Sequence, residues 1–166
     1  MRFSRHRLVG LPPLLLALTV AGCSSADGSA TTAVPSPDAA VTELCHELDA
    51  ALPTELEGQD RTDPEPGSKL TAGWGSPAII LRCGVERPPK MIDPKVAEGR
   101  DDRAIAGGVD GVEWLQERAA EGAFRFTTAN RSAYVEVTVP SGRDSTGVLV
   151  ELAPPIKSAI PPGIAG

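Results

Sequence analysis

The chain has 166 residues, with 22 acidic side chains against 16 lysines and arginines, and its formal net charge is −6 at pH 7. Hydrophobic residues make up 41% of it but aromatic residues only 4%, so any core must be mainly aliphatic. This length fits one domain. Because like charges repel, the acidic balance argues against phosphate polymers as partners, and we predict no nucleic acid partner.

The N-terminus has the three parts of a secretory signal. Three arginines in the first seven residues precede an apolar run over residues 8–18, and small residues follow before Cys23. A basic head, a short hydrophobic middle and small residues at the cleavage site define such signals. A cysteine directly after Ala21-Gly22 is typical of bacterial lipoproteins. We therefore predict that residues 1–22 are a signal peptide and that Cys23 is lipidated.

A transmembrane helix and an ordinary secreted signal are the alternatives for this segment. The uncharged stretch over residues 8–22 is shorter than the roughly 18 to 20 residues that a bilayer needs. An ordinary secreted protein, cleaved at the same small residues and released, remains the other alternative. Two acyl chains anchor a protein stably, so we expect the mature chain on the outer face of the cytoplasmic membrane. Without residues 1–22 it keeps 13 basic and 22 acidic residues, a net charge of −9.

A flexible tether is expected to separate the anchor from the folded part. Residues 24–36 are mostly small or turn-forming, a composition that cannot bury a core. We thus expect the lipidated cysteine and tether over 23–36, one folded domain over 37–161 and a short tail over 162–166.

The first helix is predicted directly after this tether. Ser36 is suited to cap it and Pro37 to occupy its first position. Apolar residues then recur at helical spacing as far as Pro53. These are Val41, Leu44, Cys45, Leu48 and Leu52.

The rest of the chain indicates strands separated by proline- and glycine-rich loops. Loops are predicted over 55–67 and 87–108, and strands over 69–74, 78–85, 112–116, 124–128 and 133–139. Residues 148–160 fit a helical stripe or a strand, and we favour a short bent helix because Pro154 and Pro155 interrupt it. Together these elements predict an α+β fold, in which a four- to five-stranded mainly antiparallel sheet packs against an N-terminal helix and a short C-terminal helix.

Two cysteines are predicted to face the core. Cys45 lies on the apolar stripe of the first helix, and Cys83 alternates with Ile79, Leu81 and Val85 on one face of a strand. An exported chain meets oxidising conditions, so we predict a Cys45–Cys83 disulfide. A free thiol or a metal site are the alternatives, although a structural zinc site needs four ligands. We predict no metal and no cofactor.

Several segments together resemble a known family. They are Leu44-Cys45-His46, Gly73-Trp74-Gly75-Ser76-Pro77, Leu81-Arg82-Cys83-Gly84-Val85, Gly111-Val112-Glu113-Trp114, Phe126-Thr127-Thr128, Tyr134-Val135-Glu136-Val137 and Leu152-Ala153-Pro154. In this combination the chain resembles the actinobacterial lipoproteins grouped as domain-of-unknown-function family 3515. The resemblance implies an exported, lipid-anchored domain with a cysteine bridge, and it implies no catalytic activity.

The sequence holds few residues for catalysis. His46 is the single histidine after the signal peptide, and its position beside acidic residues indicates a solvated surface histidine. The pairs Asp101-Asp102 and Asp110 with Glu113 have the chemistry of glycosidase carboxylates, but no spacing places them around a cleft. We interpret them as solvated loop residues.

Four side chains are candidates for a recognition surface: Trp74, Trp114, Tyr134 and Arg82. Aromatic rings and arginine often dominate binding surfaces, although core packing is the simpler interpretation for the tryptophans. We therefore expect a non-catalytic binding or accessory domain at the cell envelope, acting on a protein or a cell-wall ligand. A carboxylate-dependent hydrolase and a small-ligand-binding lipoprotein are the alternatives.

Overall fold

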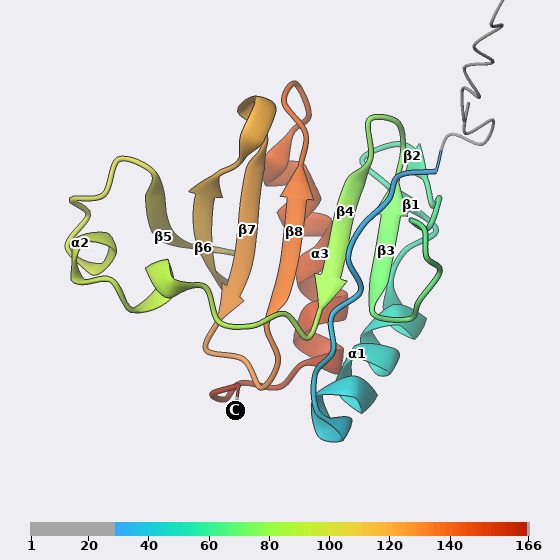
Figure 1. Cartoon of the computed structure of the whole chain (residues 1–166), viewed down its shortest axis with the longest axis horizontal. Helices are drawn as coiled ribbons and strands as arrows, with labels where there is room; N and C mark the ends of the chain where they lie inside the picture. Colours follow the sequence, from blue (N-terminus) through green and yellow to red (C-terminus); the bar gives the residue numbers. More distant parts are fainter. Residues whose placement is uncertain (1–28, 166) are drawn as a thin grey trace, which may run out of the picture.

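The computed structural model describes residues 29–165, so the predicted signal peptide and the predicted lipidation site, Cys23, lie outside the described residues. Its centre is a six-stranded antiparallel sheet with two long helices on one face (Figure 1), which confirms the predicted α+β class. In sheet order the strands are β3 (Thr71–Trp74), β4 (Ile79–Cys83), β8 (Val135–Val139), β7 (Phe124–Ala129), β6 (Val112–Arg118) and β5 (Ala104–Val109). We call the face that carries the helices the back face and the opposite one the front face.

Helix α1 (Ala39–Ala51) begins two residues later than the sequence indicated. The carboxylate of Asp38 accepts a hydrogen bond from the backbone N–H of Val41 at 2.9 Å, so Asp38 is the cap and not Ser36. An N-cap side chain bonds to the N–H two or three residues further on, and Pro37 therefore lies outside the helix. The helix ends at Leu52, just before Pro53, as predicted.

The predicted loop over 55–67 contains a small hairpin, β1 (Glu55–Leu56) and β2 (Gln59–Asp60). Its turn residues Glu57 and Gly58 both have positive φ, at 49° and 69°, as a two-residue turn between antiparallel strands requires. Leu56 is fully buried. Strands of two residues show no periodicity, so the sequence pattern could not indicate them.

The predicted loop over 87–108 is also partly regular, and it supplies a sixth strand. It holds the 3-10 helix η1 (Pro89–Ile92), the short helix α2 (Pro94–Ala97) and strand β5. β5 pairs with β6 through the Asp110-Gly111 turn, whose φ angles are 46° and 76°. Its sequence, Ala-Ile-Ala-Gly-Gly-Val, lacks the alternation and the bulky residues that identify strands, which explains why four or five were expected.

Helix α3 (Ser145–Ala159) settles the ambiguous C-terminal segment. It is longer than expected and continues through Pro154 and Pro155. These prolines leave the carbonyls of Val150 and Glu151 without their usual helical donors. Both of those residues are exposed, so water can bond to their carbonyls and the helix persists.

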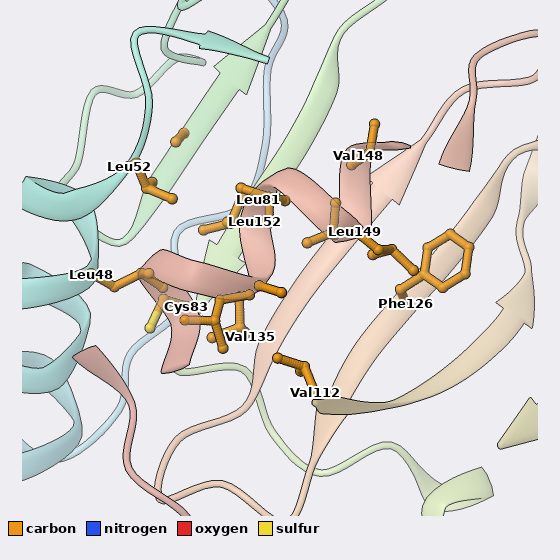
Figure 2. Packing of buried hydrophobic residues seen from close by; sticks show 14 of the residues in the cluster. Leu48, Leu52, Leu81, Cys83, Val112, Phe126, Val135, Val148, Leu149 and Leu152 are labelled. Carbon is orange, nitrogen blue, oxygen red and sulfur yellow. The ribbon is translucent and has the colours of Figure 1, made fainter. Parts of the chain in front are cut away.

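The core fills the space between the back face and the helices. Figure 2 shows Leu149 and Leu152 of α3 beside sheet residues such as Val135. Cys45 of α1 and Cys83 of β4 are buried and joined by the predicted disulfide, with Cα atoms 5.6 Å apart. The covalent bond thus fastens α1 to the sheet.

Two segments cover parts of the front face. A small apolar cluster of Val96, Ala104 and Leu115 packs α2 against β5 and β6. On the other side, residues 29–38, which we call the strap, run along β4 toward α1 (Figure 1), and the carbonyl of Ala33 accepts a hydrogen bond from Arg82 Nε at 3.0 Å. Part of the segment predicted as tether is therefore held against the sheet.

Candidate functional site

The four residues predicted to form a recognition surface lie apart. Trp74 is fully buried and its indole N–H donates to the carbonyl of Pro53 at 3.0 Å. Trp114 is buried with its ring edge-on to Phe126, the ring centroids 6.5 Å apart. Both tryptophans belong to the back face and its core, whereas Arg82 and Tyr134 line a groove on the front face. The structure therefore brings together only two of the four.

This groove, of about 770 Å³, lies between the strap and the sheet. Its lining includes Pro35 and Pro37 from the strap and Arg82, Gly84, Tyr134 and Glu136 from β4, β8 and the adjoining turns. The strap is one wall, and the ends of two neighbouring strands are the floor. Arg87 stands exposed at the rim.

One glycine determines how closely the strap approaches the sheet. Gly84 has φ +83°, and a Cβ atom added to it would lie 2.6 Å from Cγ of Pro37. Any other residue would clash with the strap and would also adopt a backbone conformation that side chains disfavour. Gly84 and Pro37 together thus set the depth of the groove.

A row of alternating charges crosses the front face beside the groove. Arg82 bonds to Glu136 at 3.0 Å on the neighbouring strand, and Arg125 bonds to Glu117 at 3.1 Å one strand further on. Arg125 Nε also lies 3.9 Å from the other oxygen of Glu136, so the row spans β4, β8, β7 and β6. These pairs neutralise one another locally, although the chain as a whole is acidic.

The groove still presents donors to a ligand. Arg82 lines the groove and uses Nε and one terminal nitrogen for Ala33 and Glu136, so its second terminal nitrogen has no hydrogen bond to any residue that the structure describes. The Tyr134 hydroxyl likewise has no hydrogen bond within residues 29–165. A guanidinium and a phenol beside apolar proline rings can bind acceptor groups and pack against flat or aliphatic surfaces.

One member of each carboxylate pair considered for catalysis has a structural partner elsewhere. Asp101 accepts hydrogen bonds from Lys90 and, at 2.8 Å, from the backbone N–H of Arg103. The Lys90 ammonium, and after it this backbone N–H, lowers the pKa of Asp101. Asp110 pairs with Lys157 of α3 at 3.1 Å. Neither carboxylate lines the groove.

His46 lies outside the groove lining, and the described part of the chain contains no cluster of metal-binding side chains. His46 is half-buried on α1 and does not line the groove. Within residues 29–165, no three His, Cys, Asp or Glu side chains gather where they could bind a metal ion. Among the same residues, no helix has the length and apolar character needed to span a membrane.

A second hollow, which no sequence pattern predicts, lies on the back face between β5 and the start of α3. This cleft of about 160 Å³ is lined by both polar and apolar atoms, with Ile105, Gly107, Trp114 and Leu149 among its residues. Trp114 Nε1 is buried and has no hydrogen-bond partner among the described residues. The cleft escaped sequence analysis because β5 itself did.

The groove escaped it for a different reason. Its wall comes from a segment whose composition indicates a tether, and its floor comes from β4 and β8, which follow that segment by about 50 and about 100 residues. The available signals were Pro35 and Pro37, which stiffen an extended backbone, and the outward alternation of Arg82 opposite Cys83.

Fold and site together define a small single-domain α+β protein, cross-linked by one disulfide, with a polar groove on the face opposite its helices. The chain belongs to the family described as "Protein of unknown function (DUF3515)", whose match covers residues 9–164. This confirms the family resemblance of its motifs. Searches of curated proteins and of solved structures found no match.

Proposed function

We propose that this protein is an exported lipoprotein, held by Cys23 at the outer face of the cytoplasmic membrane, and that its front groove is a non-catalytic binding site for an envelope partner. The observation that carries the proposal is the strap. It is the part of the chain that follows the proposed anchor, and it is also one wall of the groove. Anchoring would therefore hold the groove close to the membrane surface.

The buried disulfide supports the export part of the proposal. Cys45 and Cys83 are 0% and 1% exposed, and their bond joins a helix to the central sheet. Such structural disulfides form and persist outside the cytosol, whereas the reducing cytosol opposes them. A chain that folds around this bond is suited to the compartment to which the signal would send it.

The chemistry of the groove supports a partner rich in hydrogen-bond acceptors. Arg82 and Tyr134 offer donors at the floor, and Pro35 and Pro37 offer apolar contact at the wall. Peptide carbonyls, sugar hydroxyls and carboxylates all match this combination. A segment of an envelope protein or a cell-wall strand is the partner class we expect.

Metabolic labelling tests the anchor. Cells grown with a clickable fatty acid should label the protein and retain it in the membrane fraction, whereas a Cys23→Ser variant should lose both the label and the membrane association. A Ser24→Ala variant is the matched control, since it changes a neighbouring small residue and leaves the cysteine. Equal labelling of the Cys23→Ser variant and the unmodified chain would refute the anchor.

Site-specific photocrosslinking tests the groove in living cells. A photoreactive side chain at Arg87, on the groove rim, should capture a defined partner. The same side chain at Ala120, which is exposed and lies outside the groove lining, is the control. Capture of the same species from both positions would show that contact is not made through the groove.

A further inference from the structure

Strand β5 is an edge of the sheet (Figure 1), and part of its backbone lacks hydrogen-bond partners within residues 29–165. The two-residue Asp110-Gly111 turn makes Val109 and Val112 a hydrogen-bonded pair. Bonding alternates along antiparallel strands, so odd-numbered residues of β5 bond to β6 and even-numbered ones direct N–H and C=O outward. The bond from Arg118 N–H to the carbonyl of Arg103, at 3.0 Å, follows this alternation.

The β5 edge also lacks the usual protection. Natural edge strands are shielded by charges, prolines, bulges or covering loops. The opposite edge, β3, is buried along its length, and Thr62 N–H bonds to its Gly73 carbonyl at 2.8 Å. In β5, by contrast, residues 105–108 are exposed and uncharged, and Ile105 is 59% exposed.

A projecting apolar side chain and an unfilled space lie side by side on this edge. Ile105 and Gly107 are two residues apart and therefore share the back face, where both line the cleft beside α3. The side chain of Ile105 projects into solvent, whereas a Cβ atom added to Gly107 would meet nothing within 4 Å. The edge thus carries an apolar projection and, next to it, an unfilled space.

We propose that β5 pairs antiparallel with β5 of a second copy of this chain, with Ala106 opposite Ala106 across a two-fold axis normal to the sheet. Opposed residues share a face, and this axis keeps the helices of both copies on the same side. Ile105 of each copy then lies opposite Gly107 of the other and fills the space above it.

The outward backbone groups match in this register. Each Ala106 N–H donates to the Ala106 carbonyl of the other copy, and each Gly108 N–H donates to the opposing Ala104 carbonyl. The Ala104 N–H is already bonded to the Asp101 carboxylate at 3.1 Å. Helix α2 packs near Ala104. The residue of the other copy that lies opposite Ala104 is Gly108, which has no side chain to clash with this helix.

Charges at the ends of the pair are complementary. Arg103 continues the alternation of β5 onto the back face, beside the position of Asp110 from the other copy. The Asp110 carboxylate is on the same side, since it bonds to Lys157 of α3. Both residues are exposed. Each copy therefore contributes one cation and one anion to the ends of the shared ladder.

The resulting dimer should be weak in dilute solution. A single strand edge buries less surface than the about 1,200 Å² at the lower end of specific interfaces. Both copies are acidic, so their overall repulsion opposes association and is screened by salt. We expect dimerisation to increase with protein concentration and with ionic strength.

Cysteine crosslinking tests the register. The purified full-length chain carries Cys23→Ala, so that the introduced thiol is the single free one. Ala106→Cys should form disulfide-linked dimers, because opposed residues lie about 5.5 Å apart. Ile105→Cys and Gly107→Cys should crosslink when mixed but not alone, because their identical pairs lie about 7 to 8 Å apart diagonally, at the limit of a disulfide.

Matched substitutions separate this contact from random collision. Adding Ile105→Lys should abolish the Ala106→Cys dimer, whereas adding Ile164→Lys should preserve it, because Ile164 is 87% exposed and follows Gly163, whose N–H bonds to the Asn130 carbonyl between β7 and β8. Circular dichroism confirms that each variant is folded. The proposal is overturned if folded Ala106→Cys stays monomeric on oxidation, if each single variant crosslinks as well as the mixture, or if both lysine variants behave alike.

Discussion

At the scale of single residues, the two tryptophans differ by one hydrogen bond. Both are buried, but the indole N–H of Trp74 donates to Pro53 whereas that of Trp114 has no partner among the described residues. Replacing Trp74 by Phe breaks this hydrogen bond and leaves the part-buried carbonyl of Pro53 without its donor. A neutral hydrogen bond contributes about 1 kcal/mol.

We therefore expect Trp74→Phe to lower the free energy of unfolding by about 1 kcal/mol more than Trp114→Phe. The second variant is the matched control, because it removes the same ring atoms without breaking a hydrogen bond. Urea unfolding followed by circular dichroism measures both. Equal losses would show that the bond to Pro53 contributes nothing to stability.

The disulfide is the second feature at this scale. It joins residues separated by 38 positions, and on the chain-entropy account a loop of this size stabilises the fold by about 4 kcal/mol. Replacing both Cys45 and Cys83 by Ala should lower the free energy of unfolding by about 2 to 5 kcal/mol. Denaturant titration measures the loss, and the same titration of the unmodified protein under reducing conditions should approach the value of the double variant. A change below 1 kcal/mol would contradict the prediction.

Residues of this kind were the most predictable from the sequence. Two independent periodicities, one helical and one of a strand, place Cys45 and Cys83 in the core, and the predicted export signal implies an oxidising compartment, in which a buried pair has few other chemical outcomes. The burial of Trp74 is harder to predict from the sequence, since the same pattern suits a core position and an exposed one. Its burial depends on Pro53, which approaches only in the folded chain.

At the scale of elements, the segment between β4 and β5 is held by a small ionic network. Lys90 bonds to Asp101 and Asp93, and Asp101 also accepts from the backbone at the start of β5. Lys90 and the backbone N–H of Arg103 lower the pKa of Asp101. In turn, the carboxylates of Asp101 and Asp93 raise the pKa of Lys90. Both shifts favour the ion pair of the folded state.

The sign of the pH dependence follows from these directions. A carboxyl group whose pKa is lowered by folding stabilises the fold above its unfolded pKa, near 3.9, and loses that contribution as pH falls through its folded pKa. We expect Asp101→Asn to destabilise the protein at pH 7, and the difference from the unmodified chain to shrink below about pH 4. The contribution of Lys90 is lost instead as pH rises through its raised pKa.

Thermal unfolding over a range of pH measures this difference, and Asp102→Asn is the control. Asp102 is adjacent and exposed but makes none of the three bonds of Asp101. A pH-independent cost of Asp101→Asn would mean that its bonds to the backbone, and not its charge, account for the stabilisation.

The elements differ in how far the sequence determines them. β8 has strict alternation of valines with polar residues and was predicted almost to its ends. β5 was missed because its outer edge is exposed and its glycines carry no pattern, so only pairing with β6 makes it a strand. Helix α3 was predicted too short, because the cost of its prolines depends on whether Val150 and Glu151 face water, which the fold decides.

At the scale of the whole molecule, the groove is the feature that no local pattern could give. It exists because the strap runs along the front face beside β4 and β8, which follow it in the sequence by about 50 and about 100 residues. The alternation of Arg82 and Cys83 identified the face of the strand, but not the segment that would cover it. Predicting such a site requires the tertiary arrangement, and testing it requires a change that moves the strap alone.

Gly84 provides that change. With φ +83° it disfavours any side chain, and a Cβ atom would also press on Pro37 at 2.6 Å. Gly142 is the matched control, since its φ is +84° and a Cβ atom there meets nothing within 4 Å. Both alanine variants should lose about 1 to 2 kcal/mol from the backbone conformation, but only Gly84→Ala should also displace the strap.

Amide hydrogen exchange distinguishes the two effects. The N–H of Thr32 bonds to the carbonyl of Glu65 at 3.0 Å and reports whether the strap is seated. In Gly84→Ala this amide should exchange faster. The exchange rates of amides in β8 should change only as much as they do in Gly142→Ala. Photocrosslinking from Arg87 should weaken in the first variant alone, because a displaced strap removes one wall of the groove. If Thr32 exchanges equally in both variants, the strap is held by contacts other than those with Gly84, and the groove does not depend on the close approach of Pro37 to the sheet.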